Sequence, residues 1–254
     1  MRGIIFDIKE FAVHDGAGIR MTVFMKGCLL SCLWCHNPEG QRSAPEIMKK
    51  SGCVNCGLCR QSCSNPDCAP YGVCLHACPH GLLSVCGTYT DSETLAHRLV
   101  RDADIFRSSG GGVTISGGEP LMQGEFVCAL LAALGKAGIH RAIETSGYSD
   151  GALFREVIGN CDFVYCDLKL ALNAEHIKYT GVSNAPILAN IDILRSSGVP
   201  YKMRVPLIPG ITDTAENLSA IRKLTEPSEV EYLPYNTLAG AKYAMLGRKY
   251  ALDR

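Results

Sequence analysis

Along most of the chain, segments with the hydrophobic pattern of strands alternate with segments that have the hydrophobic pattern of helices. Short apolar, β-branched runs predict strands at residues 22–26, 113–116, 141–145, 163–167, 201–207 and 230–233. Between them, apolar residues recur at helical spacing, and the stripes at 126–134 and 187–194 each end shortly before a glycine. Strands that alternate with helices predict a parallel sheet with right-handed crossovers.

The number of strand–helix units limits the architecture. Six units are two fewer than a closed eightfold barrel requires. We therefore predict an α/β fold, a partial (β/α)6 TIM-like barrel. Residues Thr90–Glu93 have the pattern of a capping box, and the apolar stripe Leu95, Leu99, Ala103 and Phe106 after it predicts a helix.

One connection is much longer than the others. Residues 27–89 separate the first strand from its helix, where two to six residues are usual. Of 14 cysteines, eleven lie between Cys28 and Cys86. We predict a barrel of residues 1–48 and 88–254 with a ferredoxin-like iron–sulfur module at 49–87, called the insert below. Three cysteines outside this region are expected to pack as small apolar side chains: Cys128, Cys161 and Cys166.

Charge and hydropathy restrict the partners. The 25 Lys and Arg residues balance the 25 Asp and Glu residues, so no basic excess favours nucleic acid. The longest nearly apolar stretch, 126–139, is too short to cross a bilayer. The first residues lack the pattern of a secretory signal, so a cytoplasmic protein is expected. In that compartment, clustered thiols indicate metal or redox chemistry rather than disulfides.

The loop after the first strand carries the strongest chemical signal. Cys28, Cys32 and Cys35 have C-x3-C-x2-C spacing. Three thiolates from one tight loop suit three corners of a cubane iron–sulfur cluster and leave its fourth iron open. A Cys3His zinc site completed by His36 is the alternative, and a disulfide is a weaker one.

Polar or glycine-rich groups follow the other predicted strands. In α/β barrels the carboxyl ends of strands meet at one rim, so these groups are expected beside Cys28. Purely structural roles are the alternatives to ligand binding: ordinary turns, a rim salt bridge between Asp167 and Lys169, and an apolar strand end at Ile208. The candidates are Gly117, Gly118, Glu119, Glu144, Thr145, Asp167, Lys169, Arg204, Ile208 and Asn236.

Taken together, these motifs resemble a known family. The cysteine spacing, with Trp34 before the last thiol, is similar to the radical S-adenosylmethionine superfamily. The segments 14–28, 34–39, 116–120, 167–169, 204–210 and 233–236 resemble the activating enzymes of glycyl radical enzymes. The resemblance implies that a site-differentiated [4Fe-4S] cluster reductively cleaves S-adenosylmethionine. The resulting 5′-deoxyadenosyl radical would abstract a glycine Cα hydrogen from a partner glycyl radical enzyme, under anaerobic conditions.

The resemblance also implies roles for individual residues. Gly117, Gly118 and Glu119 would hold the cofactor's amino group, and Trp34 and Ile208 would contact adenine. His36, Lys169, Arg204 and Asn236 would also contact the cofactor, and Asp15 and Gly16 would meet the partner's glycine loop. A monovalent cation is expected at Glu144, Thr145 and Asp167, and flavodoxin or ferredoxin as electron donor. Three residues depart from the family pattern: Ala17, Glu144 and Asn236.

The insert has the spacing of a bacterial ferredoxin with one ligand missing. Cross-pairing of its halves gives one cluster at Cys53, Cys56, Cys59 and Cys78, and a second at Cys63, Cys68 and Cys74. Tyr71 stands where the second cysteine of the second half is expected. Cys86 or Asp67 would complete the second site, or the site holds three irons. One cluster with spare thiols, or zinc, remains as an alternative.

The insert and the whole chain each leave functional alternatives open. The insert would relay electrons to the barrel cluster, dock the partner, or only stabilise the fold. For the whole chain, the rivals are a radical enzyme acting on a small metabolite and a non-enzymatic electron carrier. The rim motifs disfavour the carrier, which needs none of them.

Overall fold

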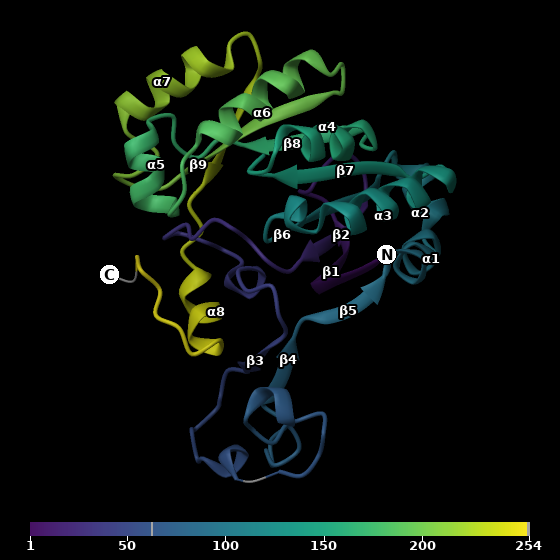
Figure 1. Cartoon of the computed structure of the whole chain (residues 1–254), viewed down its shortest axis with the longest axis vertical. Helices are drawn as coiled ribbons and strands as arrows, with labels where there is room; N and C mark the ends of the chain where they lie inside the picture. Colours follow the sequence, from purple (N-terminus) through teal and green to yellow (C-terminus); the bar gives the residue numbers. More distant parts are fainter. Residues whose placement is uncertain (62, 253–254) are drawn as a thin grey trace.

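A mixed eight-stranded sheet forms the body of the protein, in the order β10-β9-β8-β7-β6-β2-β1-β5 (Figure 1). The computed structural model describes residues 1–61 and 63–252. Neighbouring strands among the first six of this order, from β10 to β2, are parallel, which confirms the predicted parallel sheet. These strands are β2 (Arg20–Met25), β6 (Gly112–Gly117), β7 (His140–Thr145), β8 (Phe163–Asp167), β9 (Tyr201–Leu207) and β10 (Val230–Pro234).

Two further strands extend one edge of the sheet. The strand β1 (Arg2–Ala12) pairs antiparallel with β2, and β5 (Thr88–Asp91) pairs antiparallel with β1. Neither was predicted, because charged residues interrupt the apolar run of β1, as at a half-exposed edge, and β5 overlaps the residues interpreted as a capping box. The order runs from β10 to β5 without closing, so within the described residues the barrel is open.

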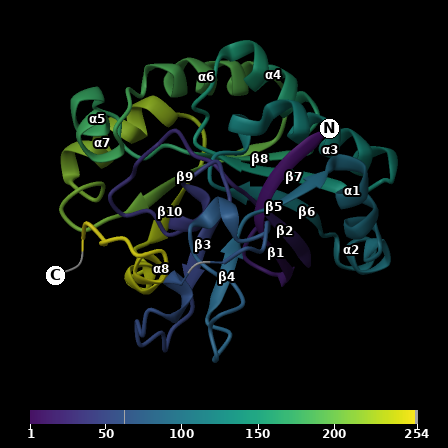
Figure 2. The same ribbon diagram turned by 60° about the horizontal axis from the view of Figure 1, so that its bottom comes forward.

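Helices cover the outer face of the curved sheet (Figure 2). Two expectations need correction: Asp91 rather than Thr90 caps α1, and the predicted long helix breaks at Arg101 and Asp102 into α1 and α2. Helices α5 and α8 were not predicted. The helices are α1 (Ser92–Val100), α2 (Ala103–Ser109), α3 (Gly124–Lys136), α4 (Gly151–Gly159), α5 (Asn173–Thr180), α6 (Ala185–Ser196), α7 (Ala215–Thr225) and α8 (Ala239–Met245).

The hydrophobic core lies between the parallel strands and helices α1–α4, α6 and α7. It includes strand residues such as Val23, Ile115 and Val164, and helix residues such as Leu130. Because strand side chains alternate, the residues between them face the inside of the barrel. The three cysteines expected to pack do so: Cys161 and Cys166 belong to the core and Cys128 packs against it.

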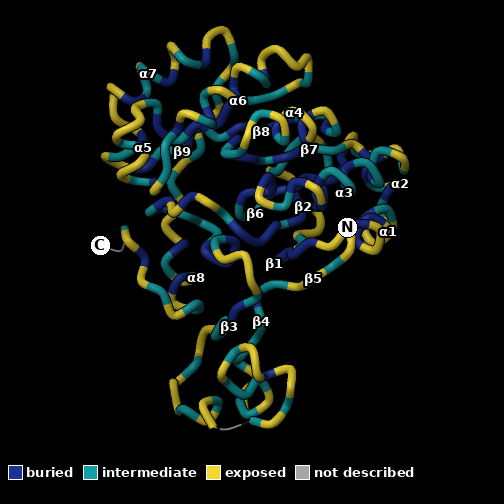
Figure 3. The backbone as a smooth tube through the Cα atoms, in the orientation of Figure 1, coloured by how far each residue is buried: buried dark blue, intermediate teal, exposed yellow. Residues whose placement is uncertain are grey.

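The insert projects from the body on a two-stranded stem of β3 (Glu46–Lys49) and β4 (Leu83–Cys86), which pair antiparallel (Figure 1). It is coloured mostly as exposed or intermediate in Figure 3, whereas the body has a buried interior. Among the described residues of 49–87, only Cys68 and Cys86 are buried. No described helix is long and apolar enough to cross a membrane.

Candidate active site

The three-cysteine loop leaves the carboxyl end of β2 and is fixed by the end of α5. The Ser31 amide donates to the Thr180 carbonyl at 2.7 Å, and the Leu33 amide donates to the Tyr179 carbonyl at 3.1 Å. These bonds join segments about 150 positions apart in the chain. The unpredicted helix α5 therefore positions the loop.

The thiols of this loop are free and poorly hydrated. Burial, together with the nearby Glu119 carboxylate, raises the pKa of Cys28 to about 12. Burial also raises the pKa of Cys32 to about 12, although the Lys169 ammonium opposes this shift. Thiols in such a setting stay protonated unless a metal supplies positive charge, because a coordinating thiol is deprotonated outright.

One ring nitrogen of the half-buried His36, next to the loop, also lacks a partner. The Nε2 atom of His36 is inaccessible to solvent and makes no hydrogen bond. Burial lowers the pKa of His36, and the ammonium groups of Lys169 and Lys242 lower it further. A neutral imidazole nitrogen and three free thiols fit a site built around a bound group.

Apolar side chains surround the same loop. Trp34 is 4% exposed and Ile208 is 1% exposed, and both belong to one cluster with Leu30, Cys32 and Leu170. The structure therefore brings the predicted Trp34 and Ile208 together beside the thiols. The contact fits both predicted readings, an adenine wall and an apolar packing unit.

The Glu119 carboxylate accepts four hydrogen bonds from the protein. Its carboxylate accepts hydrogen bonds from the Thr145 hydroxyl at 2.6 Å and from the Ser146 amide at 2.8 Å. The Ser146 hydroxyl and the Leu121 amide also donate to it. Burial raises the pKa of Glu119 against these hydrogen bonds, which lower it. Glu119 thus joins the ends of β6 and β7 at the rim.

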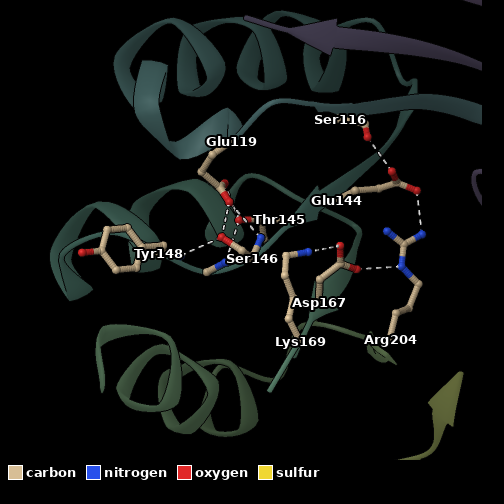
Figure 4. Close-up of polar contacts among 10 residues, drawn as sticks. Ser116, Glu119, Glu144, Thr145, Ser146, Tyr148, Asp167, Lys169 and Arg204 are labelled. Carbon is tan, nitrogen blue, oxygen red and sulfur yellow. Dashed lines mark hydrogen bonds and ion pairs between the residues drawn. The ribbon is translucent and has the colours of Figure 1, made fainter. Parts of the chain in front are cut away.

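A second polar network crosses four strands inside the barrel (Figure 4). The Arg204 guanidinium donates to Glu144 at 2.7 Å and to Asp167 at 3.0 Å. Lys169 Nζ lies 3.3 Å from Asp167, and the Ser116 hydroxyl donates to Glu144. Asp167 and Lys169 thus form the rim salt bridge that was the alternative to a cofactor-binding role.

The charges in this network stabilise one another. Burial alone would raise the pKa of Asp167, but Arg204 and Lys169 outweigh it and lower that pKa. Burial would lower the pKa of Lys169, but the Asp167 carboxylate outweighs it and raises that pKa. Both carboxylates expected at the cation site, Glu144 and Asp167, are paired with Arg204, so the cation itself stays a prediction.

Gly117 and Gly118 let two backbones approach closely. A Cβ on Gly118 would lie 2.2 Å from the Gly27 carbonyl oxygen, and one on Gly117 would lie 2.4 Å from the Met25 nitrogen. Gly117 also has a φ of 109°, which favours glycine. These glycines seat the end of β6 against the start of the cysteine loop. A role in holding the cofactor's amino group stays a prediction.

The sequence matches the Radical SAM superfamily over residues 22–219. The chain belongs to this superfamily. Activating enzymes for glycyl radical enzymes are 34–38% identical to it over 97–99% of its length, and the protein is itself such an enzyme, which uses a [4Fe-4S] cluster and S-adenosylmethionine.

Named relatives support this membership. The isethionate sulfite-lyase activating enzyme of Oleidesulfovibrio alaskensis is 38% identical over 97% of this chain and 88% of its own. The 4-hydroxyphenylacetate decarboxylase activating enzyme of Clostridioides difficile is 35% identical over 98% and 87%. A crystal structure of Streptococcus suis SuiB bound to S-adenosylmethionine has a TM-score of 0.54 at 14% identity, covering 88% of this chain and 41% of that chain. This likeness confirms the partial-barrel fold.

The remaining predicted contacts of the radical SAM site lie in two places. The Asp15 carboxylate accepts from the Thr22 hydroxyl at 2.6 Å, and its carbonyl accepts from the Thr114 hydroxyl at 2.7 Å. Gly16 follows with a φ of 134°. Their turn therefore lies on side chains of the inner face of β2 and β6. Asn236 is exposed, and its carboxamide oxygen accepts from the Leu238 amide at 2.9 Å.

A buried lysine that the sequence analysis did not single out ties this site to the insert. Lys26 is 0% exposed and donates to the Glu39 carbonyl at 2.5 Å and to Glu46 at 2.9 Å. The Cys86 sulfur lies 4.0 Å from its ammonium. The signal in the sequence for this anchoring role was a lysine at the end of an apolar strand, directly before Gly27. The stem of the insert is thus anchored two residues before Cys28.

The insert thiols gather as cross-pairing predicts. The sulfur atoms of Cys63, Cys68 and Cys74 lie within 4.8 Å of one another. A separate pocket is lined by the other four predicted ligands, Cys53, Cys56, Cys59 and Cys78.

Neither residue expected to complete the second site joins this group of three. Cys86 is held at the base of the stem by Lys26, and no carboxylate, Asp67 included, belongs to the group within the described part of the chain. The group of three therefore lacks a fourth ligand among the described residues, and metal binding at either set of thiols stays a prediction.

Proposed function

We propose that this enzyme installs the glycyl radical on a partner that lyses or decarboxylates a small organic acid or ammonium compound. The main support is sequence similarity, over nearly the whole chain, to activating enzymes for isethionate sulfite-lyase, 4-hydroxyphenylacetate decarboxylase and choline trimethylamine-lyase. The last of these is 34% identical over 99% of this chain. Identities of 34–38% are too even to choose among the three partners.

The loop residues would hold the reactive groups. Cys28, Cys32 and Cys35 would bind three irons of the cluster, and Lys169 would balance the added negative charge. When bound, the cluster and S-adenosylmethionine supply the electron and the 5′-deoxyadenosyl radical. Trp34 and Ile208 would form the apolar wall that keeps water from this site.

The polar inner face would receive the partner's chain. Asp15 and Gly16 lie over β2 and β6, on the same inner side as Glu144, Asp167 and Arg204. The open barrel leaves a lateral entrance for a loop of another protein. Glycine at position 16 lets the turn lie close to Arg20, because a Cβ there would lie 2.8 Å from the Arg20 side chain.

The insert would serve as an electron-relay module. Residues 49–87 offer one four-thiol pocket and one three-thiol group. We propose iron–sulfur clusters at both, reduced by a flavodoxin or ferredoxin. The Lys26–Glu46 anchor, which fixes the stem beside the barrel loop, supports this role.

The decisive experiment is electron paramagnetic resonance under anaerobic conditions. Reduced enzyme, S-adenosylmethionine and each of the three candidate partners are mixed separately. We expect the doublet of a glycyl radical with one of them, and none with the Cys32→Ala variant. Cofactor cleavage that depends on a small metabolite, with no partner radical, would instead support the rival small-molecule enzyme.

A further inference from the structure

The three-thiol group of the insert differs from the four-thiol pocket beside it. Both lie in a segment with ferredoxin spacing, and the Cys74 amide donates to the Cys59 carbonyl at 2.7 Å, which joins the two halves. Yet only one half has a full set of cysteines. We infer that Cys63, Cys68 and Cys74 hold an iron–sulfur cluster whose fourth iron position has no protein thiolate, so that it releases and rebinds one iron. This inference rests on the auxiliary clusters proposed above.

The burial and hydrogen bonding of the cysteine sulfurs are those expected of a metal-binding group. Cys68 is 2% exposed, and its sulfur accepts a hydrogen bond from the Leu75 amide at 3.3 Å. In the neighbouring pocket, the Cys78 sulfur accepts from the Leu82 amide at 3.4 Å. Amide hydrogen bonds to ligand sulfurs tune iron–sulfur clusters, so both groups have this feature.

Tyr71 occupies the place in the sequence pattern where the missing cysteine is expected. The second half of the insert keeps C-x2-x-x2-C-x3-C-P spacing from Cys68 to Pro79, with tyrosine at the second ligand place. Tyr71 closes a short turn, its amide donating to the Cys68 carbonyl at 3.0 Å. The backbone therefore keeps the turn that a ligand needs, while the side chain supplies a weak phenol in place of a thiolate.

The other sources of a fourth thiolate or carboxylate are absent from the described neighbourhood. Cys86 lies at the far end of the stem with Lys26 and the Glu39 carbonyl. Asp67 does not join the group, although it precedes Cys68. Structural zinc prefers four protein ligands, and three thiols with no described fourth ligand fit it poorly.

The chemistry of exchange is simple. A reduced three-iron cluster with four sulfides takes up one Fe²⁺ to give a four-iron cluster, without electron transfer. Loss of that iron followed by one-electron oxidation, with ferricyanide as oxidant, gives the oxidised three-iron cluster. A cluster with four protein thiolates resists this loss.

The test uses the full-length chain with Cys28, Cys32 and Cys35 replaced by alanine, so that only the insert binds clusters. After anaerobic reconstitution and brief ferricyanide treatment, we expect about seven irons per chain and the near-isotropic signal of a three-iron cluster. Fe²⁺ with dithionite should restore about eight irons. Adding Tyr71→Cys should abolish the signal and keep about eight irons throughout.

Two matched variants separate the alternatives. Tyr71→Phe should behave as the parent, and Cys86→Ala should leave the three-iron signal unchanged. The inference is wrong if the parent resists iron loss as Tyr71→Cys does, if Cys86→Ala creates the lability, or if the group binds zinc. If the insert binds no iron–sulfur cluster at all, the auxiliary-cluster proposal itself fails.

Discussion

The barrel and the insert are stabilised in different ways. The barrel buries a continuous apolar core between its strands and helices. The insert buries only two described residues, and both are cysteines. A segment of this length without a core is expected to rely on metal for its fold. The comparison teaches that cysteines in one chain can serve a reaction at one site and folding at another.

The largest expected effect is loss of the reaction without loss of the barrel. Replacing Cys28, Cys32 or Cys35 with alanine should reduce 5′-deoxyadenosine formation to background, because each removes an iron ligand. The thermal unfolding of the barrel should change little, since the core is untouched. Chromatography of the nucleoside product and circular dichroism check the two halves of this prediction. A variant that retains cofactor cleavage would contradict the assigned cluster.

Removing iron should unfold the insert and spare the barrel. A chelator under reducing conditions should raise amide hydrogen exchange throughout residues 49–87 to nearly unprotected rates, because no core remains. Helix α3, whose Leu130 and Leu134 are 0% exposed, should keep its protection. Hydrogen-exchange mass spectrometry measures both regions in one sample. Equal loss of protection in both would show that the barrel also depends on metal.

The same leucine truncation should have unequal costs in the two regions. Leu130→Ala removes a fully buried side chain and should reduce the free energy of unfolding by about 2–5 kcal/mol. Leu58→Ala, at a residue 40% exposed in the insert, should change it by less than about 0.5 kcal/mol. Urea denaturation followed by circular dichroism gives both values. Similar costs would mean that the insert has an apolar core of its own.

The polar network should respond to pH in a defined direction. Arg204→Gln leaves Glu144 and Asp167 without their guanidinium and should cost about 3 kcal/mol at neutral pH. Because Arg204 lowers the pKa of Asp167, its stabilisation is present above the unfolded pKa and fades as pH falls below about 4. The difference between wild-type and variant unfolding midpoints should therefore shrink with acid.

This midpoint difference isolates the network, since acid removes clusters from both proteins alike. A constant difference from pH 7 to about pH 3 would show that Arg204 acts by packing rather than by charge.

A small effect is expected at Cys128, which packs against the barrel core. Cys128→Ala should leave iron content and cofactor cleavage unchanged and alter stability by less than about 1 kcal/mol. Burial raises the pKa of Cys128 to about 11, which makes it a poor nucleophile and metal ligand at neutral pH. Iron analysis and product assays check this. A loss of iron would assign Cys128 a ligand role.

The sequence predicted elements with strong periodicity and missed those defined by tertiary contacts. The six parallel strands and α3 were found, because a buried strand and an amphipathic helix leave clear patterns. The edge strand β1 was missed, since Asp7, Lys9 and Glu10 break its apolar run. Helix α5 was missed because its few buried residues are polar, namely His176 and Thr180.

The candidate site shows the same division. Spacing identified the cysteine loop and suggested how the insert thiols pair, and positions at the ends of predicted strands identified the rim residues. It did not reveal that Ser146 shares Glu119 with Thr145, or that Arg204 bridges two carboxylates. Such partnerships depend on how neighbouring strands are aligned, and a single sequence does not specify that register.

Lys26 has a consequence for exchange of modules among proteins of this kind. The ammonium belongs to the barrel, whereas its carboxylate partner, Glu46, belongs to the stem of the insert. A graft that removed the stem would leave a cation enclosed without an anion, two positions before Cys28. The insert is thus free to change its length and its thiols, while the first residue of its stem must be inherited together with the barrel.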